Sequence, residues 1–293
     1  MADIDTAVRT ATGRKVAYTQ TGQADGAPVF YCHGFPGSRL DFHQPFNQPA
    51  LDGSGVRLIG LDRPGFGDSD FQPRRRYADW PSDVSAVADE LGIDRFGIIA
   101  YSAGAPYAIA CALAYPERLT FVGIVSGVGP AETPGFHRGM GATNAILTRL
   151  SRWAPPLARL AISRARKQVG NAPEKFSRQF DKELSPPDLE QHRDPGLRQA
   201  ARNLFLESTK NGPRGAVEDY RVWANPSGLD YGAVSVPVRI WHGDADELVP
   251  MHHADYIAET IPTADLTVLP GIGHLHTAER WREFLTTARN QAR

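Results

Sequence analysis

The sequence predicts an α/β fold: a mostly parallel, doubly wound sheet that carries a helical insertion. Six short apolar runs alternate with helical patterns, as expected for strands covered by helices on both faces. Glycines cluster directly after these runs, and sites in open α/β sheets lie at the carboxyl ends of the strands. Residues 131–230 break this rhythm with proline-punctuated helical patterns, which predicts the insertion.

Strands are predicted from apolar runs and from alternating patterns. Residues 6–22 indicate two short strands around the Thr12-Gly13 turn, and the second alternates apolar and polar residues as a half-buried strand does. The continuous apolar runs, which indicate buried strands, lie at 28–34, 56–62, 95–101, 119–129, 237–243 and 265–271.

Helices are predicted between these strands and after them. Residues 81–91 place Val84 and Val87 at helical spacing, and either Asp79 or Ser82 is expected to cap this helix. Further helical patterns lie at 102–119, 251–261 and 277–290. The regular succession of strand and helix supports the parallel sheet.

Composition excludes several classes of protein. Hydrophobic residues make up 41% and charged residues 22%, a globular balance that excludes wholesale disorder. The net charge of −1 predicts neither nucleic acid nor a membrane surface as partner, and no apolar run reaches the ~20 residues of a membrane helix. Cys32 and Cys111 are too few for a disulfide framework and are expected to be buried in a reducing compartment. With no apolar stretch at its start to indicate a signal peptide, the chain is expected to be cytoplasmic.

The insertion is predicted to be a helical cap, 131–230, over a core formed by 1–130 plus 231–293. The cap holds 16 Lys and Arg against 11 Asp and Glu, or +5, whereas the remainder holds 16 against 22, or −6. This excess fits either solvated helix faces with acidic neighbours or the steering of an anionic substrate. The cap's aromatic residues are expected in the core or at the cap–core interface, one or two of them lining an acyl pocket: Trp153, Phe176, Phe180, Phe205, Tyr220 and Trp223.

The segment Ala100-Tyr101-Ser102-Ala103-Gly104 stands between a predicted buried strand and a helix. A serine in this context is held on a sharp turn, and small residues on either side let strand and helix approach closely. The start of the helix offers unpaired N–H groups to a developing oxyanion. Ser102 is therefore a candidate nucleophile, and the alternative is a structural serine in a tight turn.

With this segment and four others in order, the chain resembles the α/β-hydrolase family, specifically its serine-nucleophile, cap-bearing, esterase-like members. The resemblance covers nearly the whole length and is weakest in 131–230. The matching segments are an oxyanion loop HGFPGS (33–38), a glycine turn DRPGFGDS (62–69), a nucleophile elbow AYSAG (100–104), an acid turn GDADELVP (243–250) and a histidine loop GIGH (271–274). Ala100 replaces the usual first glycine of the elbow, a change that is conservative in size.

The resemblance implies a catalytic triad in the family's chain order. Ser102 would attack the substrate, His274 would act as base and then acid, and Asp246 would hold the imidazole in one tautomer. The backbone N–H groups of Phe35 and Ala103 would form the oxyanion hole. A His274 base predicts a rate that falls as the imidazole protonates, near its ordinary pKa of about 6.5.

Neighbouring residues compete for these roles. Asp244 or Glu132 is an alternative acid, although Asp244 is expected to stabilise a turn. His276 is an alternative base that is expected to pack or to face solvent. Substrate contacts are expected from three residues beside the elbow and the oxyanion loop: His33, Gly34 and Tyr101.

The predicted function is cofactor-free hydrolysis of a small-molecule carboxylic ester, lactone or thioester through an acyl-enzyme. Spacings typical of metal or nucleotide sites do not occur, so neither a metal nor a cofactor is expected. One alternative is a C–C bond hydrolase or another cofactor-free lyase, cyclase or oxygenase of the same fold. Another is a small-molecule receptor that retains the triad.

Overall fold

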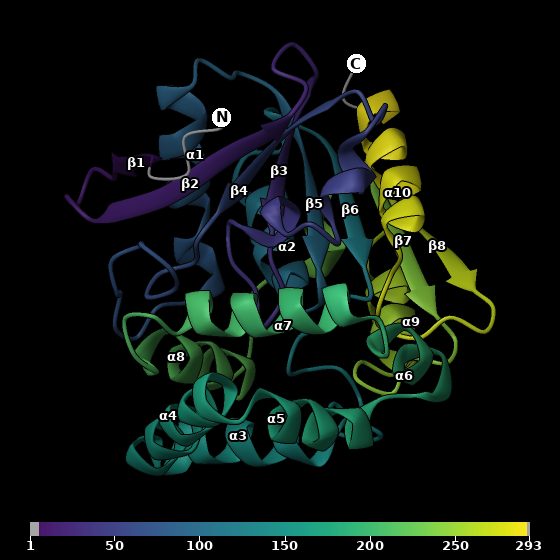
Figure 1. Cartoon of the computed structure of the whole chain (residues 1–293). Coiled ribbons are helices and arrows are strands. Elements are labelled where there is room, and N and C mark those ends of the chain that lie inside the picture. The colour runs from purple at the N-terminus through teal and green to yellow at the C-terminus, as the bar shows by residue number, and fades with distance from the viewer. Residues whose placement is uncertain (1–5, 292–293) are drawn as a thin grey trace.

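An eight-stranded, mostly parallel sheet forms the centre of the molecule (Figure 1). The strand order is β1-β2-β4-β3-β5-β6-β7-β8; β2 pairs antiparallel with β1 and β4, and the strands from β4 to β8 run parallel. The predicted α/β fold is thus confirmed. The strands are β1 Thr6–Arg9, β2 Lys15–Gly22, β3 Ala27–Cys32, β4 Val56–Leu61, β5 Phe96–Tyr101, β6 Leu119–Val125, β7 Val238–Gly243 and β8 Ala264–Leu269.

This computed structural model describes residues 6–291. Residues 1–5 and 292–293, which belong to the predicted core, lie outside the described residues. Within 6–291, no helix combines the length and the apolar character needed to cross a bilayer. Cys32 and Cys111 are both buried and free of disulfide bonds.

Helices cover both faces of the sheet. The helices α1 Pro81–Glu90, α2 Ala105–Ala114 and α9 His252–Thr260 contribute to one apolar core, and α10 Ala278–Gln291 contributes to a second core on the opposite face. Each face of the sheet has its own apolar core because successive side chains of a strand point to opposite faces, and strand β5 is an example. Its Ile98 belongs to the first core and its Ile99 to the second.

The start of α1 differs from the prediction. The residue before this helix is Trp80, and no side-chain hydrogen bond caps it. Only Trp80 separates a short 3-10 turn, Tyr77–Asp79, from Pro81, and the Asp79 carboxylate accepts a hydrogen bond from the Arg76 amide. The Ser82 hydroxyl donates to the Asp79 carbonyl instead of capping the helix. Neither predicted residue is the cap.

Between β6 and β7 the chain forms a block of helices beyond the carboxyl ends of the strands (Figure 1). Four of these helices begin with a proline, whose missing N–H costs nothing at the first helical position. The prolines therefore divide the block into separate helices. They are α3 Ala142–Trp153, α4 Pro155–Asn171, α5 Pro173–Phe180, α6 Pro186–His192, α7 Pro195–Ser208 and α8 Arg214–Trp223.

Candidate active site

Ser102 stands on a strained turn at the carboxyl end of β5. Its φ is 52°, in the left-handed region that costs a non-glycine residue about 1–3 kcal/mol. The turn is tight because α2 begins directly after it, against the end of β3. A side chain at Gly104 would collide with the Cys32 carbonyl, so glycine is required there. Such local strain presents one side chain at the sheet edge, as expected for an elbow.

Two backbone N–H groups flank Ser102. Ala103 lies in the first turn after β5, where helical N–H groups lack partners within the helix. The second group belongs to Phe35, in a loop that passes close to the elbow: a Cβ added to Gly34 would lie 3.3 Å from the Cβ of Ser102. The oxyanion loop and the elbow are therefore in contact.

Arg63 orients the peptide that carries the Phe35 N–H. Its guanidinium donates to the Gly34 carbonyl at 3.0 Å and also to the His33 carbonyl. Since the C=O and N–H of one trans peptide point in opposite directions, the Phe35 N–H faces away from Arg63. Arg63 is fully buried and pairs with Asp219 of α8 at 2.7 Å. This ion pair links the oxyanion loop to the helical block.

The candidate acid and base are hydrogen-bonded. His274 Nδ1 lies 2.7 Å from Asp246 Oδ2, and both side chains are buried. The other carboxylate oxygen of Asp246 accepts the amides of Leu248 and Val249 at 2.9 and 2.7 Å. These contacts fix the carboxylate and leave Nε2 as the ring nitrogen available for proton transfer.

The electrostatics of the pair favour its charged form. Burial acts to lower the pKa of His274, but the charge and hydrogen bond of Asp246, with a smaller contribution from Asp188, leave that pKa above 6.5. Burial acts to raise the pKa of Asp246, yet His274 and the Val249 amide leave it below its ordinary value. The pair thus stabilises the imidazolium that a general base forms.

Tyr101 joins the elbow to the histidine loop. Its hydroxyl donates to the His274 carbonyl at 3.0 Å, and the two rings lie 5.1 Å apart. Among residues 6–291, no hydrogen bond connects the Ser102 hydroxyl with the His274 ring. Catalytic hydrogen bonds often tighten only when substrate binds. The structure therefore brings Asp246 and His274 into contact and places Ser102 next to the residue that holds His274.

The competing residues have other partners. Asp244 accepts the Gly271 amide at 2.7 Å, which stabilises the turn. Glu132 accepts the amide and the hydroxyl of Ser227. His276 bonds to the Ser126 hydroxyl at 3.0 Å, and burial lowers its pKa to about 3, so the ring stays neutral.

Two expected substrate contacts are engaged in the protein itself. His33 is fully buried, with Nδ1 bonded to the Gly34 carbonyl at 2.8 Å and Nε2 to the Arg63 amide at 3.2 Å. These contacts support the oxyanion loop, and contact between His33 and substrate stays a prediction. The Tyr101 hydroxyl is likewise taken up by His274. Gly34 remains beside Ser102.

Asp188 of α6 also belongs to the site, although the sequence does not signal it. This fully buried carboxylate accepts the amide of His274 at 2.8 Å and that of Leu275 at 2.7 Å. A side chain at Gly273 would collide with it, so this glycine lets the histidine loop approach α6. No local motif signals the contact, because His274 and Leu275 lie 86 and 87 residues after Asp188 in the sequence.

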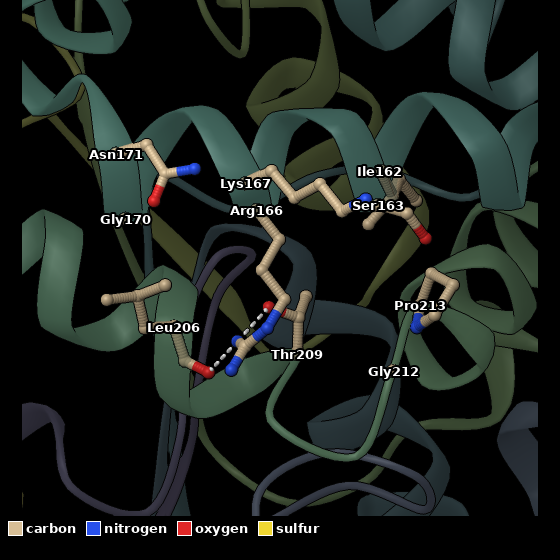
Figure 2. A pocket seen from close by; sticks show the side chains of 10 residues that line it. All are labelled: Ile162, Ser163, Arg166, Lys167, Gly170, Asn171, Leu206, Thr209, Gly212 and Pro213. Carbon is tan, nitrogen blue, oxygen red and sulfur yellow. Dashed lines mark hydrogen bonds between the residues drawn. The ribbon is translucent and has the colours of Figure 1, made fainter.

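A cavity of about 430 Å³ lies elsewhere, between α4, α7 and the turn before α8 (Figure 2). Arg166 spans it and donates to the carbonyl of Leu206 and to the hydroxyl of Thr209. None of its lining residues belongs to the candidate active site. Across residues 6–291, no group of three or more His, Cys, Asp or Glu side chains is arranged to hold a metal ion.

Comparison with known proteins agrees with this architecture. The chain is 25% identical to a 2-hydroxymuconate semialdehyde hydrolase of Pseudomonas putida, covering 88% of this chain and 86% of that protein. It is 25% identical to the sn-1-specific diacylglycerol lipase ABHD11 of Danio rerio, covering 96% and 83%. The solved structure of esterase RhEst1 from Rhodococcus sp. ECU1013 superposes with a TM-score of 0.72, at 20% identity and coverage of 99% and 98%. A family model described as alpha/beta hydrolase fold matches residues 27–276, and the chain belongs to this family.

Proposed function

We propose that this protein is a cofactor-free serine hydrolase that cleaves a small-molecule carboxylic ester, lactone or thioester through an acyl-enzyme. The observation that carries the proposal is the buried Asp246–His274 pair, which lies beside a serine in a strained conformation at the sheet edge. A nucleophile, a base and an orienting acid are what acyl transfer requires.

In the proposed reaction, the Ser102 oxygen attacks the carbonyl carbon while His274 Nε2 takes the hydroxyl proton. The carbonyl oxygen becomes an oxyanion that the amides of Phe35 and Ala103 stabilise. Collapse of this intermediate breaks the bond to the leaving group, which receives the proton from His274. Water activated by His274 then hydrolyses the acyl-enzyme and restores Ser102.

We also propose that residues 131–230 act as a cap over a core of 1–130 plus 231–293. The ring of Phe35, from the oxyanion loop, lies 5.4 Å from the ring of Tyr220 in α8 and 6.3 Å from that of Phe205 in α7. Helices of this block therefore border the loop on which the oxyanion would form. Such a position suits a role in selecting the substrate.

A second candidate is hydrolysis of a carbon–carbon bond. A relative named as a 2-hydroxymuconate semialdehyde hydrolase, which matches most of the chain, favours it. Another relative with similar coverage is named as a lipase, which favours the ester reaction. We rank the ester reaction first because the proposed oxyanion donors and base suffice for it.

Rapid-mixing kinetics with p-nitrophenyl esters of increasing acyl length test the proposal. A burst of one p-nitrophenol per chain, followed by steady turnover, is expected, and Ser102→Ala should lower turnover by at least about 10⁴-fold. A burst without appreciable turnover would favour the receptor alternative. Turnover that survives Ser102→Ala would contradict the proposal.

A further inference from the structure

The outer face of α3 and α4 exposes large apolar side chains. Among the described residues, five large apolar side chains are exposed, and four of them lie on these two helices. Trp153, expected in the core or at the cap–core interface, is instead 77% exposed. The others are Ile146, Leu157 and Leu160. The two helices that carry these side chains pack against each other, and exposed apolar side chains gathered on one part of a surface suit contact with a partner.

These side chains follow the helical period. On α3, Ile146 and Trp153 lie seven residues apart, two turns along the same side of the helix. On α4, Leu157 and Leu160 are three apart, next to the corner that follows Trp153. In Figure 1, α3 and α4 lie in the layer of helices farthest from the sheet. The exposed apolar side chains therefore belong to helices on the far side of the helical block from the sheet.

The same helices carry unbalanced positive charge. No Asp or Glu occurs from residue 133 to residue 173. The ion pairs of the helical block are formed by α5 to α8 and the turns between them, as in Arg202–Glu174 and Arg221–Glu218. Among residues 6–291, no ion pair involves the cations of α3 and α4. These cations are Arg149, Arg152, Arg159, Arg164, Arg166 and Lys167, and all but Arg166 are exposed.

The exposed apolar side chains and the cations of α3 and α4 together favour one kind of partner. Symmetric pairing with a second copy would bring two sets of cations together, which like-charge repulsion opposes. A nucleic acid would match the cations but would leave the exposed Leu157 and Leu160 in contact with phosphates. Helices that lie in a membrane interface pair Trp and Leu on one face with Lys and Arg beside it.

We propose that the α3–α4 face docks on an anionic phospholipid surface. The apolar side chains enter the interface, and the cations meet the phosphate groups. This proposal goes beyond the proposed hydrolase and does not depend on it. No membrane partner was expected from the net charge of −1. That sum does not reveal the positive charge of +5 on residues 131–230, because the remainder of the chain carries −6.

Tryptophan fluorescence tests the docking directly. Trp153 should dominate any change in tryptophan emission on contact with vesicles, because the other four tryptophans are at most 8% exposed: Trp80, Trp223, Trp241 and Trp281. Vesicles of phosphatidylglycerol should shift the emission to the blue, and brominated acyl chains should quench it. Vesicles of phosphatidylcholine should do neither. An emission that is unchanged by phosphatidylglycerol, or changed equally by both lipids, would overturn the proposal.

Substitutions separate the charged and apolar contributions. Arg159→Gln with Arg164→Gln should weaken partitioning onto phosphatidylglycerol about fivefold for each cation removed. Leu157→Ser with Leu160→Ser should weaken it roughly tenfold or more. Val268→Ser, which alters the exposed apolar side chain on β8, is the matched control and should leave it unchanged.

Two further measurements make the result unambiguous. Ser102→Ala should bind vesicles like the wild type, so that failure of docking and failure of the hydrolase proposal are read separately. Thermal melts of the double variants should match the wild type, because the altered side chains are exposed. A blue shift that grows with protein concentration in the absence of lipid would indicate self-association and would overturn the lipid assignment.

Discussion

The two sides of the helical block 131–230 are built differently. On the inner side, the carboxylates of Asp188 and Asp219 are buried and hydrogen-bonded. Asp188 accepts two backbone amides and the Ser185 hydroxyl, and Asp219 pairs with two arginines and accepts the Tyr107 hydroxyl. On the outer side, α3 and α4 carry exposed apolar residues and cations without ion-pair partners among the described residues. Buried carboxylates persist only where partners compensate their desolvation. The inner side therefore belongs to the scaffold of the site, whereas the outer side is a surface for a partner.

The largest effect is expected in the core, at the acid. Asp246→Asn removes the charge that stabilises the His274 imidazolium, and kcat should fall on the order of 10⁴-fold. In the wild type the acid limb of the kcat/KM profile should have its midpoint above 6.5, because Asp246 raises the pKa of His274. The substitution should move this midpoint to lower pH.

Asp244→Asn is the matched control for this experiment. Asp244 lies two residues away and accepts a hydrogen bond from the Gly271 amide in an exposed turn. Its substitution should change kcat less than about threefold and leave the midpoint in place. If Asp244→Asn were as damaging as Asp246→Asn, the assignment of the acid would be wrong.

A smaller effect is expected on the inner side of the helical block. Asp188→Asn keeps the shape but loses the charge and one acceptor for the amides of His274 and Leu275. Displacement of the histidine loop should lower kcat roughly 10- to 100-fold with little change in KM. The acid limb should also shift to lower pH, because Asp188 contributes to raising the pKa of His274.

Two controls distinguish positioning from general damage. Asp194→Asn alters another acid of the block, the N-cap of α7, and should leave the pH profile unchanged. Leu157→Ser, on the outer side, should leave hydrolysis of a water-soluble ester unchanged. A pH midpoint in Asp188→Asn that equals the wild-type value would show that this carboxylate acts on stability alone.

Local signals account for what the sequence predicted well. Buried strands are continuous apolar runs, and the turn that carries Ser102 requires small neighbours such as Gly104, so both leave a trace in a few consecutive residues. The contact between Asp188 and the histidine loop leaves no such trace, because it joins distant segments. The prediction of the α1 cap was wrong because a 3-10 turn and Trp80 precede Pro81, and no side chain caps the helix. The exposure of Trp153 depends on how α3 packs, which its residue type does not reveal.

Labelling with a fluorophosphonate, followed by peptide mapping, tests the central claim most directly. Ser126 is a natural internal comparison, because it also has a positive φ, of 47°, and also contacts a histidine, His276. It is fully buried, whereas Ser102 is 7% exposed. We predict one label per chain, on the peptide that contains Ser102, and none in Ser102→Ala. A label on Ser126, or an undiminished label in Ser102→Ala, would contradict the assignment of the nucleophile.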